Sequence, residues 1–309
     1  MAPIKEFSSA DLNTISRLSG VSNVLVKVNG ATVAASSFTG LLDTYTGATA
    51  AYSVRKLDKD YTGYCMRIVV DSAATVGTLD SSDPEYDIGF DTNGDLDTAE
   101  IVTRCNNPSG TNYNAYVTKW YDQSGNGKDA VQTTHANMPQ IASSGAVITD
   151  NGKPALYPDG SGYFTSNFTI SDGFTATLVF NHNSEGSQYM LGSASNVLKP
   201  AFYFAGTALR LFAGSYANIG TRSTSQALYS GIYDAAGSGN IVGRVNQTES
   251  VSATASAYTP GTSMQILASN HGGMAKHTVQ EVIVWPSNQR SAGNIGNIET
   301  NINNYYSIY

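Results

Sequence analysis

Short apolar-rich runs separated by Gly, Asn and Ser recur along the second half of the chain. Within many of them apolar and polar positions alternate, which is the pattern of a strand with one buried face and one wet face. Many short strands with closely spaced turns are typical of an antiparallel sandwich or barrel. The runs predicted as strands in this half are 155–157, 175–180, 201–204, 208–212, 227–233, 241–245, 264–267 and 279–285.

The first half continues this pattern, and helical spacing is found near the end of the chain. Strands are predicted over 65–70, 86–90 and 116–121. Asp97 can cap a short helix that follows it. The spacing of Ile295, Ile298, Ile302 and Tyr305 is that of one face of a helix, which predicts a closing helix against the strands.

Residues 1–40 differ from the rest. The stretch 9–20 reads as a short helix that ends at Gly20, and Asn29-Gly30 between two β-prone runs is a strong hairpin signal. Few large apolar residues occur here, so the segment must dock on something, either the main domain or a partner. We therefore divide the chain into an attachment segment, 1–40, and a β-sandwich domain, 41–309.

Composition and charge narrow the classes of function. Of 309 residues, 41% are hydrophobic and 13% charged, which supports a real core and argues against disorder. The net charge of -7 shows no excess of basic residues of the kind that binds nucleic acid. The sequence shows neither a signal-peptide core nor a run long enough to span a bilayer, so we expect synthesis and folding in a cytosol. Two cysteines, Cys65 and Cys105, are expected to be partly buried thiols, with a bridge between them as the alternative.

Three motifs occur in the order of a known family. They are Ala51–Leu57 with Tyr61-Thr-Gly63, Tyr121-Asp-Gln-Ser-Gly-Asn-Gly127, and Asn151-Gly-Lys-Pro-Ala155. Together they resemble the catalytic domain of fungal-type α-L-arabinofuranosidases of glycoside hydrolase family 54. The tail from Val279 looks like the last strand and exit of laminin-G and lectin-type sandwiches. The resemblance implies an all-β fold: an antiparallel concanavalin A-like β-sandwich (jelly roll), here with a small N-terminal helix/hairpin appendage.

The resemblance weakens in the two segments that carry the catalytic carboxylates in the hydrolases. Glycoside hydrolysis usually needs two carboxylates that flank the scissile bond. The stretch comparable to the hydrolase nucleophile, Gly206–Gly220, contains no Asp or Glu, and the stretch comparable to its acid/base, Leu267–Gly273, offers only Asn270 and His271. We therefore predict no catalytic residue. The remaining carboxylates considered as replacements form no recognisable pair: Glu185, Asp234, Glu249 and Glu281.

The arrangement of the domain, its tail and the segment around Val26–Gly30 is similar to structural proteins of tailed bacteriophages. It implies a virion protein made in the host cytoplasm: a capsid-decoration, head-fibre or tail-fibre component. Residues 1–40 would bind other virion proteins, and the sandwich, as a homo-oligomer or in many copies, would bind host-surface glycans with avidity. The alternatives are an active arabinofuranosidase-like glycosidase and a free cellular lectin.

Tyrosines are the best candidates for sugar contact, because aromatic faces stack on sugar rings and hydroxyls bond to sugar hydroxyls. The predicted glycan-contacting residues are Tyr189, Tyr203, Tyr216, Asn270 and His271, among further tyrosines at 229, 233 and 258. Ordinary packing of these rings inside the sandwich is the competing interpretation.

A calcium-loop pattern begins at Asp91, with Asn93 and Asp95 as the other candidate ligands. An EF-hand loop needs Gly at its sixth position and Glu at its twelfth, which here are Leu96 and Val102. An Asx turn before the helix cap is the preferred interpretation, so no cofactor is predicted, with a surface calcium site as the alternative.

Overall fold

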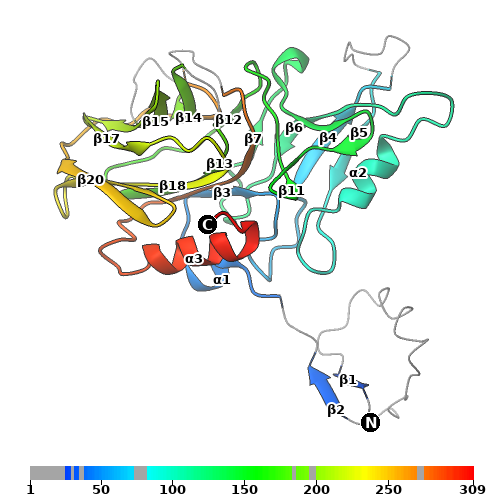
Figure 1. Cartoon of the computed structure of the whole chain (residues 1–309), viewed down its shortest axis with the longest axis horizontal. Helices are drawn as coiled ribbons and strands as arrows, with labels where there is room; N and C mark the ends of the chain where they lie inside the picture. Colours follow the sequence, from blue (N-terminus) through cyan, green and yellow to red (C-terminus); the bar gives the residue numbers. More distant parts are fainter. Residues whose placement is uncertain are drawn as a thin grey trace.

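Two antiparallel sheets stack face to face in the computed structural model (Figure 1), which describes residues 25–28, 31–34, 38–72, 82–182, 186–194, 200–269 and 275–309. The larger sheet has the order β17-β16-β15-β14-β21-β12-β7-β6-β4-β5, with β8 and β9 branching from β6. Its strands are β4 (Met66–Val70), β5 (Glu85–Ile88), β6 (Ala115–Trp120), β7 (Ala130–Val131), β8 (Gln140–Ser143), β9 (Ala146–Val147), β12 (Phe164–Ser166), β14 (Gln188–Ser193), β15 (Ala201–Ala205), β16 (Ala208–Ala213), β17 (Ser215–Thr221) and β21 (Met264–Ile266).

The smaller sheet has the order β20-β19-β18-β13-β22-β3. Its strands are β3 (Ala50–Ser53), β13 (Phe174–Phe180), β18 (Ala227–Asp234), β19 (Asn240–Val245), β20 (Thr248–Thr254) and β22 (Val279–Trp285). Two small hairpins stand apart: β1 (Leu25–Val28) with β2 (Ala31–Ala34), and β10 (Thr149–Asp150) with β11 (Lys153–Pro154). The helices among the described residues are α1 (Leu41–Thr44), α2 (Thr98–Arg104), α3 (Ile295–Tyr306) and the 3₁₀ turn η2 (His135–Asn137). The predicted all-β sandwich is confirmed.

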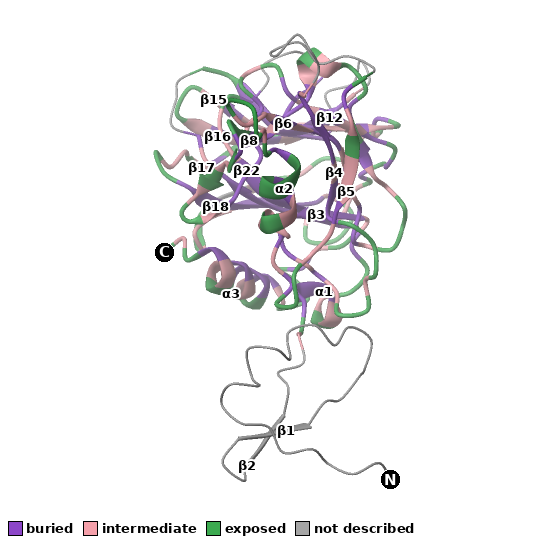
Figure 2. Cartoon of the chain, turned by 90° about the vertical axis from the view of Figure 1, so that its right-hand side faces the viewer, coloured by how far each residue is buried: buried purple, intermediate pink, exposed green. Residues whose placement is uncertain are grey.

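Aromatic side chains from both sheets fill the space between them. Tyr52 of β3 meets Trp120 of β6 with ring centroids 5.8 Å apart. Phe204 of β15 lies 6.2 Å from Phe180 of β13 and 5.4 Å from Tyr229 of β18. All five side chains are fully buried, and the buried strands run through the middle of the molecule in Figure 2. Burial of this apolar area between the layers is the main term that stabilises the sandwich.

The outer face of the smaller sheet is covered by α3. Ile295 of this helix forms a buried cluster with Ile232 of β18 and Val242 of β19. The carboxylate of Glu299, which is fully buried, pairs with Arg244 of β19 at 3.0 Å. The helix ends at Ser307, whose φ of 54° is left-handed. The predicted closing helix is therefore confirmed, and it leaves the larger sheet as the one whose outer face can present side chains.

Most strand predictions are confirmed to within one or two residues at each end. Residues 155–157 are the exception, because Leu156 and Tyr157 form only isolated bridges, to Val279 and Gln140. Asp97 caps α2 by accepting a hydrogen bond from the backbone N–H of Glu100 at 3.0 Å, as predicted. The Asn-Gly hairpin is confirmed by the pairing of Val28 with Ala31.

The predicted helix over 9–20 lies outside the described residues. The ring of Phe38 packs against Gly94. Cys65 and Cys105 are both free and buried, and burial raises the pKa of Cys105 to about 11. No helix in the described ranges is both long and apolar enough to cross a membrane.

Candidate functional site

The string Trp120–Gly127 that carries the family resemblance wraps around the backbone at β3. Asp122 is buried, and its Oδ1 accepts hydrogen bonds from the N–H groups of Ala51 and Ser124, both at 2.9 Å. Its other oxygen accepts from the N–H of Lys128 at 2.9 Å. One carboxylate thus holds three backbone donors, and it joins the turn after β6 to a strand of the opposite sheet.

Gln123 and Trp120 complete this attachment. The Gln123 side chain accepts from the N–H of Leu57 at 2.8 Å and donates to the carbonyl of Arg55 at 3.0 Å. The indole N–H of Trp120 donates to the carbonyl of Ser53 at 3.3 Å. We call residues 120–128, with the 50–57 backbone that they hold, the β3 clasp. The side chains of Trp120, Asp122 and Gln123 are bonded within the fold, so these three residues are architectural elements.

A buried ion pair lies next to the clasp. Glu281 of β22, fully buried, accepts from Nε of Arg55 at 2.8 Å and from Oγ of Ser53 at 2.7 Å. Burial opposes the charge on Arg55, but the adjacent carboxylate of Glu281 raises the pKa of its guanidinium. Glu281 is therefore held inside the fold by an ion pair and a hydrogen bond.

The other described carboxylates considered as catalytic groups are also engaged by the fold. Asp234 accepts from the N–H groups of Gly237 and Ser238 at 2.7 and 2.9 Å. Burial alone would raise the pKa of Asp234, but hydrogen bonds from Asn288, Ser238 and Gly237 lower it. Glu249 pairs with Arg290 at 2.9 Å. Glu185 lies outside the described residues. In the described second half, these carboxylates are therefore occupied in structural roles.

The predicted sugar-contacting tyrosines are brought together on the outer face of the larger sheet. Tyr189 of β14 and Tyr203 of β15 are direct register partners, and their rings stack with centroids 5.0 Å apart. Tyr203 in turn is paired with Arg210 of β16, and Arg210 with Asn218 of β17. Directly paired residues project from the same face of a sheet, so these four side chains form one row across neighbouring strands.

Exposure of the tyrosines on this face rises from β14 towards β17. Tyr189 is only 9% exposed, and burial raises the pKa of its hydroxyl. Tyr203 is half-buried, and Tyr216 of β17 is 61% exposed. The Arg210 guanidinium lies 5.6 Å from the centroid of the Tyr216 ring. We call Tyr189, Tyr203, Arg210, Tyr216 and Asn218 the tyrosine face.

The two stretches comparable to the hydrolase's catalytic segments approach this same face. One of them includes β16, which carries Arg210. In the other, Ala268 and Ser269 cross directly over Gly192 of β14, where an added Cβ would lie 2.5 Å from the Cβ of Ser269. Ser269 also hydrogen-bonds Tyr189. The predicted residues Asn270 and His271 lie outside the described residues.

The other three tyrosines considered as sugar contacts, Tyr229, Tyr233 and Tyr258, pack in or against the core. Tyr229 and Tyr233 are fully buried. The Tyr258 hydroxyl donates to the carbonyl of Ile170 at 2.8 Å, and its ring meets Tyr233 edge-on at 5.5 Å. For these three rings the competing interpretation, ordinary packing, is the one that the structure shows.

Sequence reasoning missed Arg210 as a member of this face. Gly206-Thr207 forms a two-residue turn between β15 and β16, with Ala205 paired to Ala208 and Gly206 at a φ of 62°. Counting outward from that turn pairs Tyr203 with Arg210. The alternation Ala-Leu-Arg-Leu-Phe-Ala in β16 then places Arg210 on the wet face. Both signals were present in the sequence.

The candidate calcium ligands form local structure. Asp91 Oδ1 accepts from the N–H groups of Asn93 and Asp95, both at 2.9 Å, which is an Asx turn. Asp95 accepts from the hydroxyl of Tyr305 and lies 3.8 Å from the Lys153 ammonium. Within the described ranges, no three His, Cys, Asp or Glu side chains lie close enough together to hold a metal ion.

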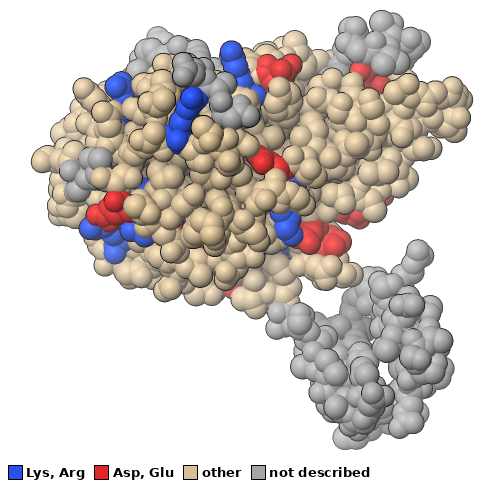
Figure 3. Space-filling view, viewed as in Figure 1, with Lys and Arg blue, Asp and Glu red and all other residues tan. Residues whose placement is uncertain are grey.

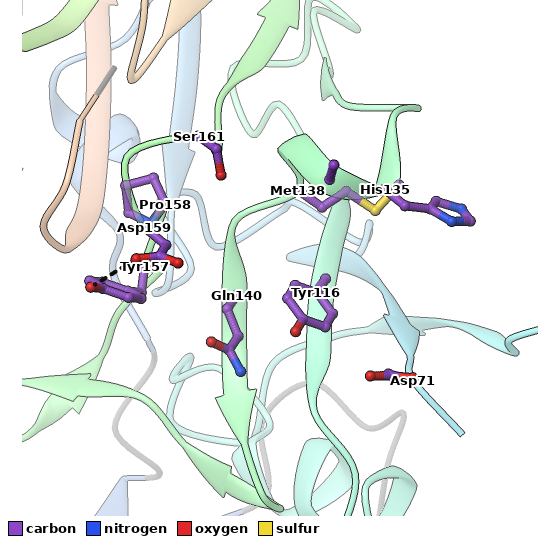
Figure 4. Close-up of a pocket in the computed structure, with 10 residues that line it drawn as sticks. Asp71, Tyr116, His135, Met138, Gln140, Tyr157, Pro158, Asp159 and Ser161 are labelled. Carbon is purple, nitrogen blue, oxygen red and sulfur yellow. Dashed lines mark hydrogen bonds between the residues drawn. The ribbon is translucent and has the colours of Figure 1, made fainter. Parts of the chain in front are cut away.

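A separate pocket of about 390 Å³ opens between η2, β8 and the 157–161 loop (Figure 4). Tyr116 and Gln140 lie side by side at its centre, with Asp159 and Asp71 on opposite sides of them in this view. The Tyr157 hydroxyl hydrogen-bonds Asp159 at 3.4 Å, and the His135 ring points away from the other labelled side chains. The pocket mixes aromatic and polar groups but brings no pair of carboxylates together in this view.

Comparison with known proteins identifies the fold class. No family model matches the chain, and no curated protein matches it. An arabinofuranosidase complexed with arabinofuranosyl-α-1,2-xylobiose is similar in structure, with a TM-score of 0.61 and 16% identity over 85% of this chain and 64% of that one. A glycoside hydrolase family 54 α-L-arabinofuranosidase soaked with a cyclic sulfate inhibitor gives 0.61 and 14%, over 85% and 65%.

These likenesses show that the chain shares the β-sandwich fold of those arabinofuranosidases. The chain spans less than two thirds of the length of these structures. The fold expected from the three sequence motifs is therefore confirmed, whereas activity has to be argued from the side chains of this chain.

Proposed function

We propose that this chain is a glycan-binding β-sandwich that binds sugars at its tyrosine face without hydrolysing them. The observation that carries the proposal is the row of Tyr189, Tyr203, Arg210 and Asn218, which lies where the two counterparts of the hydrolase's catalytic stretches approach each other. Aromatic rings and a guanidinium suit sugar stacking and hydrogen bonding.

The same position argues against hydrolysis. An acid/base and a nucleophile must both be carboxylates or comparable groups within reach of the scissile bond. Neither Gly206–Gly220 nor Leu267–Gly273 contains Asp or Glu. A face with aromatic rings and a guanidinium but without these groups supports recognition rather than turnover.

Binding is tested with the full chain on an array of soluble glycans, followed by titration calorimetry with the best ligand. Tyr203→Ala should weaken binding roughly tenfold, about 1.4 kcal/mol, because it removes a ring and the stacking partner of Tyr189. Tyr64→Ala, which removes a half-exposed tyrosine near Tyr121 in the other half of the sandwich, is the matched control and should bind normally. Equal losses in both variants, or no glycan bound by the parent chain, would reject the tyrosine face.

Hydrolysis is tested separately with an aryl α-L-arabinofuranoside. The proposal expects no release of the chromophore above the uncatalysed rate. Release that disappears when one carboxylate is changed would establish the glycosidase alternative.

The virion role stays a prediction that rests on the resemblance of arrangement alone. We propose that the sandwich is displayed on a bacteriophage particle and attached through residues 1–40. Mass spectrometry of purified particles should find the chain, and deletion of residues 1–40 should abolish its incorporation while circular dichroism still shows a folded sandwich. Absence from particles would favour the free cellular lectin.

A further inference from the structure

Arg210 differs from most other arginines of the described chain in having no carboxylate within ion-pair distance. Arg55, Arg67, Arg104, Arg244 and Arg290 each form an ion pair with Asp or Glu. Arg210 instead donates from Nε to Oδ1 of Asn218 at 2.9 Å and lies over the Tyr216 ring. The net charge of the chain is -7, and a guanidinium without a carboxylate partner among the described residues can bind a negatively charged ligand without first breaking an ion pair.

The contacts of Arg210 orient its guanidinium and leave its end available. Nε is occupied by Asn218, and the Tyr216 ring supports one side of the plane. The two terminal nitrogens have no hydrogen-bond partner among the described residues. Such a pair of parallel N–H donors matches the two oxygens of a carboxylate, and this bidentate geometry is both stronger and more directional than a bond to a hydroxyl.

The position of these two terminal nitrogens relative to the aromatic rings indicates which kind of ligand could bind. Tyr203 lies one strand from Arg210, and the row from β14 to β17 extends over about 14 Å, given strand spacings near 4.8 Å. A sugar ring stacked on Tyr203 or Tyr216 would therefore place a substituent beside the guanidinium. On the side of the molecule shown in Figure 3, uncharged side chains cover most of the described surface, with Lys, Arg, Asp and Glu scattered among them.

We propose that the tyrosine face selects acidic glycans, and that Arg210 binds the carboxylate of a uronate- or sialate-type sugar while Tyr203 and Tyr216 contact the rings. This inference rests on the proposed glycan binding and adds the charge of the ligand. The shared chemistry is a sugar carboxylate, whichever class of acidic sugar supplies it.

Matched pairs of ligands test the charge preference on the unmodified full chain. Calorimetry compares sialyllactose with lactose, and an oligogalacturonate with its methyl ester, at low and at physiological salt. At least one acidic member should bind tenfold or more tightly than its neutral partner, and the difference should shrink as salt screens the charge. Whichever pair shows the difference identifies the sugar class.

Variants assign the preference to Arg210. Arg210→Gln should lower affinity for the acidic ligand about tenfold or more and leave affinity for the neutral partner nearly unchanged. Arg210→Lys should recover only part of this loss, because an ammonium group cannot offer two parallel N–H donors to a carboxylate. Arg104→Gln, on the exposed surface of α2, is the control and should change neither. Thermal unfolding of each variant confirms that the sandwich is intact.

The outcomes distinguish a failure of the charge preference from a failure of the proposed glycan binding. Equal binding of acidic and neutral partners overturns the charge preference and leaves glycan binding standing. An acidic preference that survives Arg210→Gln overturns the assignment to Arg210. Failure of all four ligands, together with the array, overturns both proposals.

Discussion

The β3 clasp and the tyrosine face belong to the same sandwich but use their polar groups in opposite ways. In the clasp, Asp122 and Gln123 are almost inaccessible, and their side chains are bonded to backbone of another strand. On the tyrosine face, Tyr216 is largely exposed and Arg210 has no carboxylate partner among the described residues. Groups that are satisfied internally stabilise a fold, whereas oriented but unsatisfied groups are available to a ligand.

This difference explains how the most recognisable string can serve the fold. A buried acceptor with three backbone donors tolerates few replacements, so its sequence pattern is distinctive. A binding face needs only suitable rings and donors on the wet side of strands, and many sequences provide these. Changes in the clasp should therefore alter stability, and changes in the tyrosine face should alter binding.

The largest effect is expected for the ion pair beside the clasp. Glu281→Gln leaves the buried Arg55 guanidinium without a counter-charge, which should lower the free energy of unfolding by about 3–5 kcal/mol. Denaturant titration measures this loss. Glu100→Gln, which breaks the exposed pair with Arg104, should cost no more than about 1 kcal/mol. Similar small losses in both variants would contradict the structural role given to Glu281.

Within the clasp itself, Asp122→Ala should lower the free energy of unfolding by about 2–4 kcal/mol, since buried backbone N–H groups lose their acceptor. The exposed Asp60→Ala is the matched control and should stay within about 0.5 kcal/mol of the parent. At a temperature where the Asp122 variant is folded, its glycan affinity should equal that of the parent. A loss of affinity without a loss of stability would erase the distinction between the two regions.

Low pH should destabilise the part of the sandwich that lies beneath the tyrosine face. His182 is fully buried, packs 4.4 Å from the Phe204 ring, and has no hydrogen-bond partner among the described residues. Burial and the nearby positive charges of Arg222 and His277 lower its pKa to about 4. Because the unfolded chain takes up this proton near pH 6.5, stability should fall as the pH drops from about 6.5 towards 4.

His182→Phe places an apolar ring in the same apolar surroundings and should flatten that part of the stability profile. Denaturant titrations at several pH values between 4 and 7 provide the measurement. An unchanged slope in the variant would show that another group carries the acid dependence.

The smallest effect on stability is expected on the tyrosine face. Tyr216→Ala should leave the free energy of unfolding within about 0.5 kcal/mol, because the ring is largely exposed. Its affinity for the best glycan should nevertheless drop several-fold, as an aromatic contact is worth roughly 0.5–1.5 kcal/mol. Calorimetry and thermal unfolding on the same sample separate the two readouts, and a stability loss with normal binding would reverse the roles assigned to the regions.

Local patterns were sufficient for much of the fold. Alternation within runs such as 175–180 and 279–285, the Asx cap at Asp97 and the helical spacing after Ile295 each depend on near neighbours in the chain. Strands β17 and β20 were missed because their small and polar residues resemble loops, and only pairing with neighbouring strands defines them.

The sequence by itself determined the fold class, the absence of carboxylates in the two hydrolase-like stretches and the choice of Tyr189, Tyr203 and Tyr216 as candidates. Only the tertiary structure decided that Tyr189 is nearly buried, that Tyr229 and Tyr233 are core, and that Arg210 joins the row. The physical reason is that alternation decides which side of a strand a residue takes, but the order of strands and the layers covering each sheet decide whether that side meets core, helix or solvent.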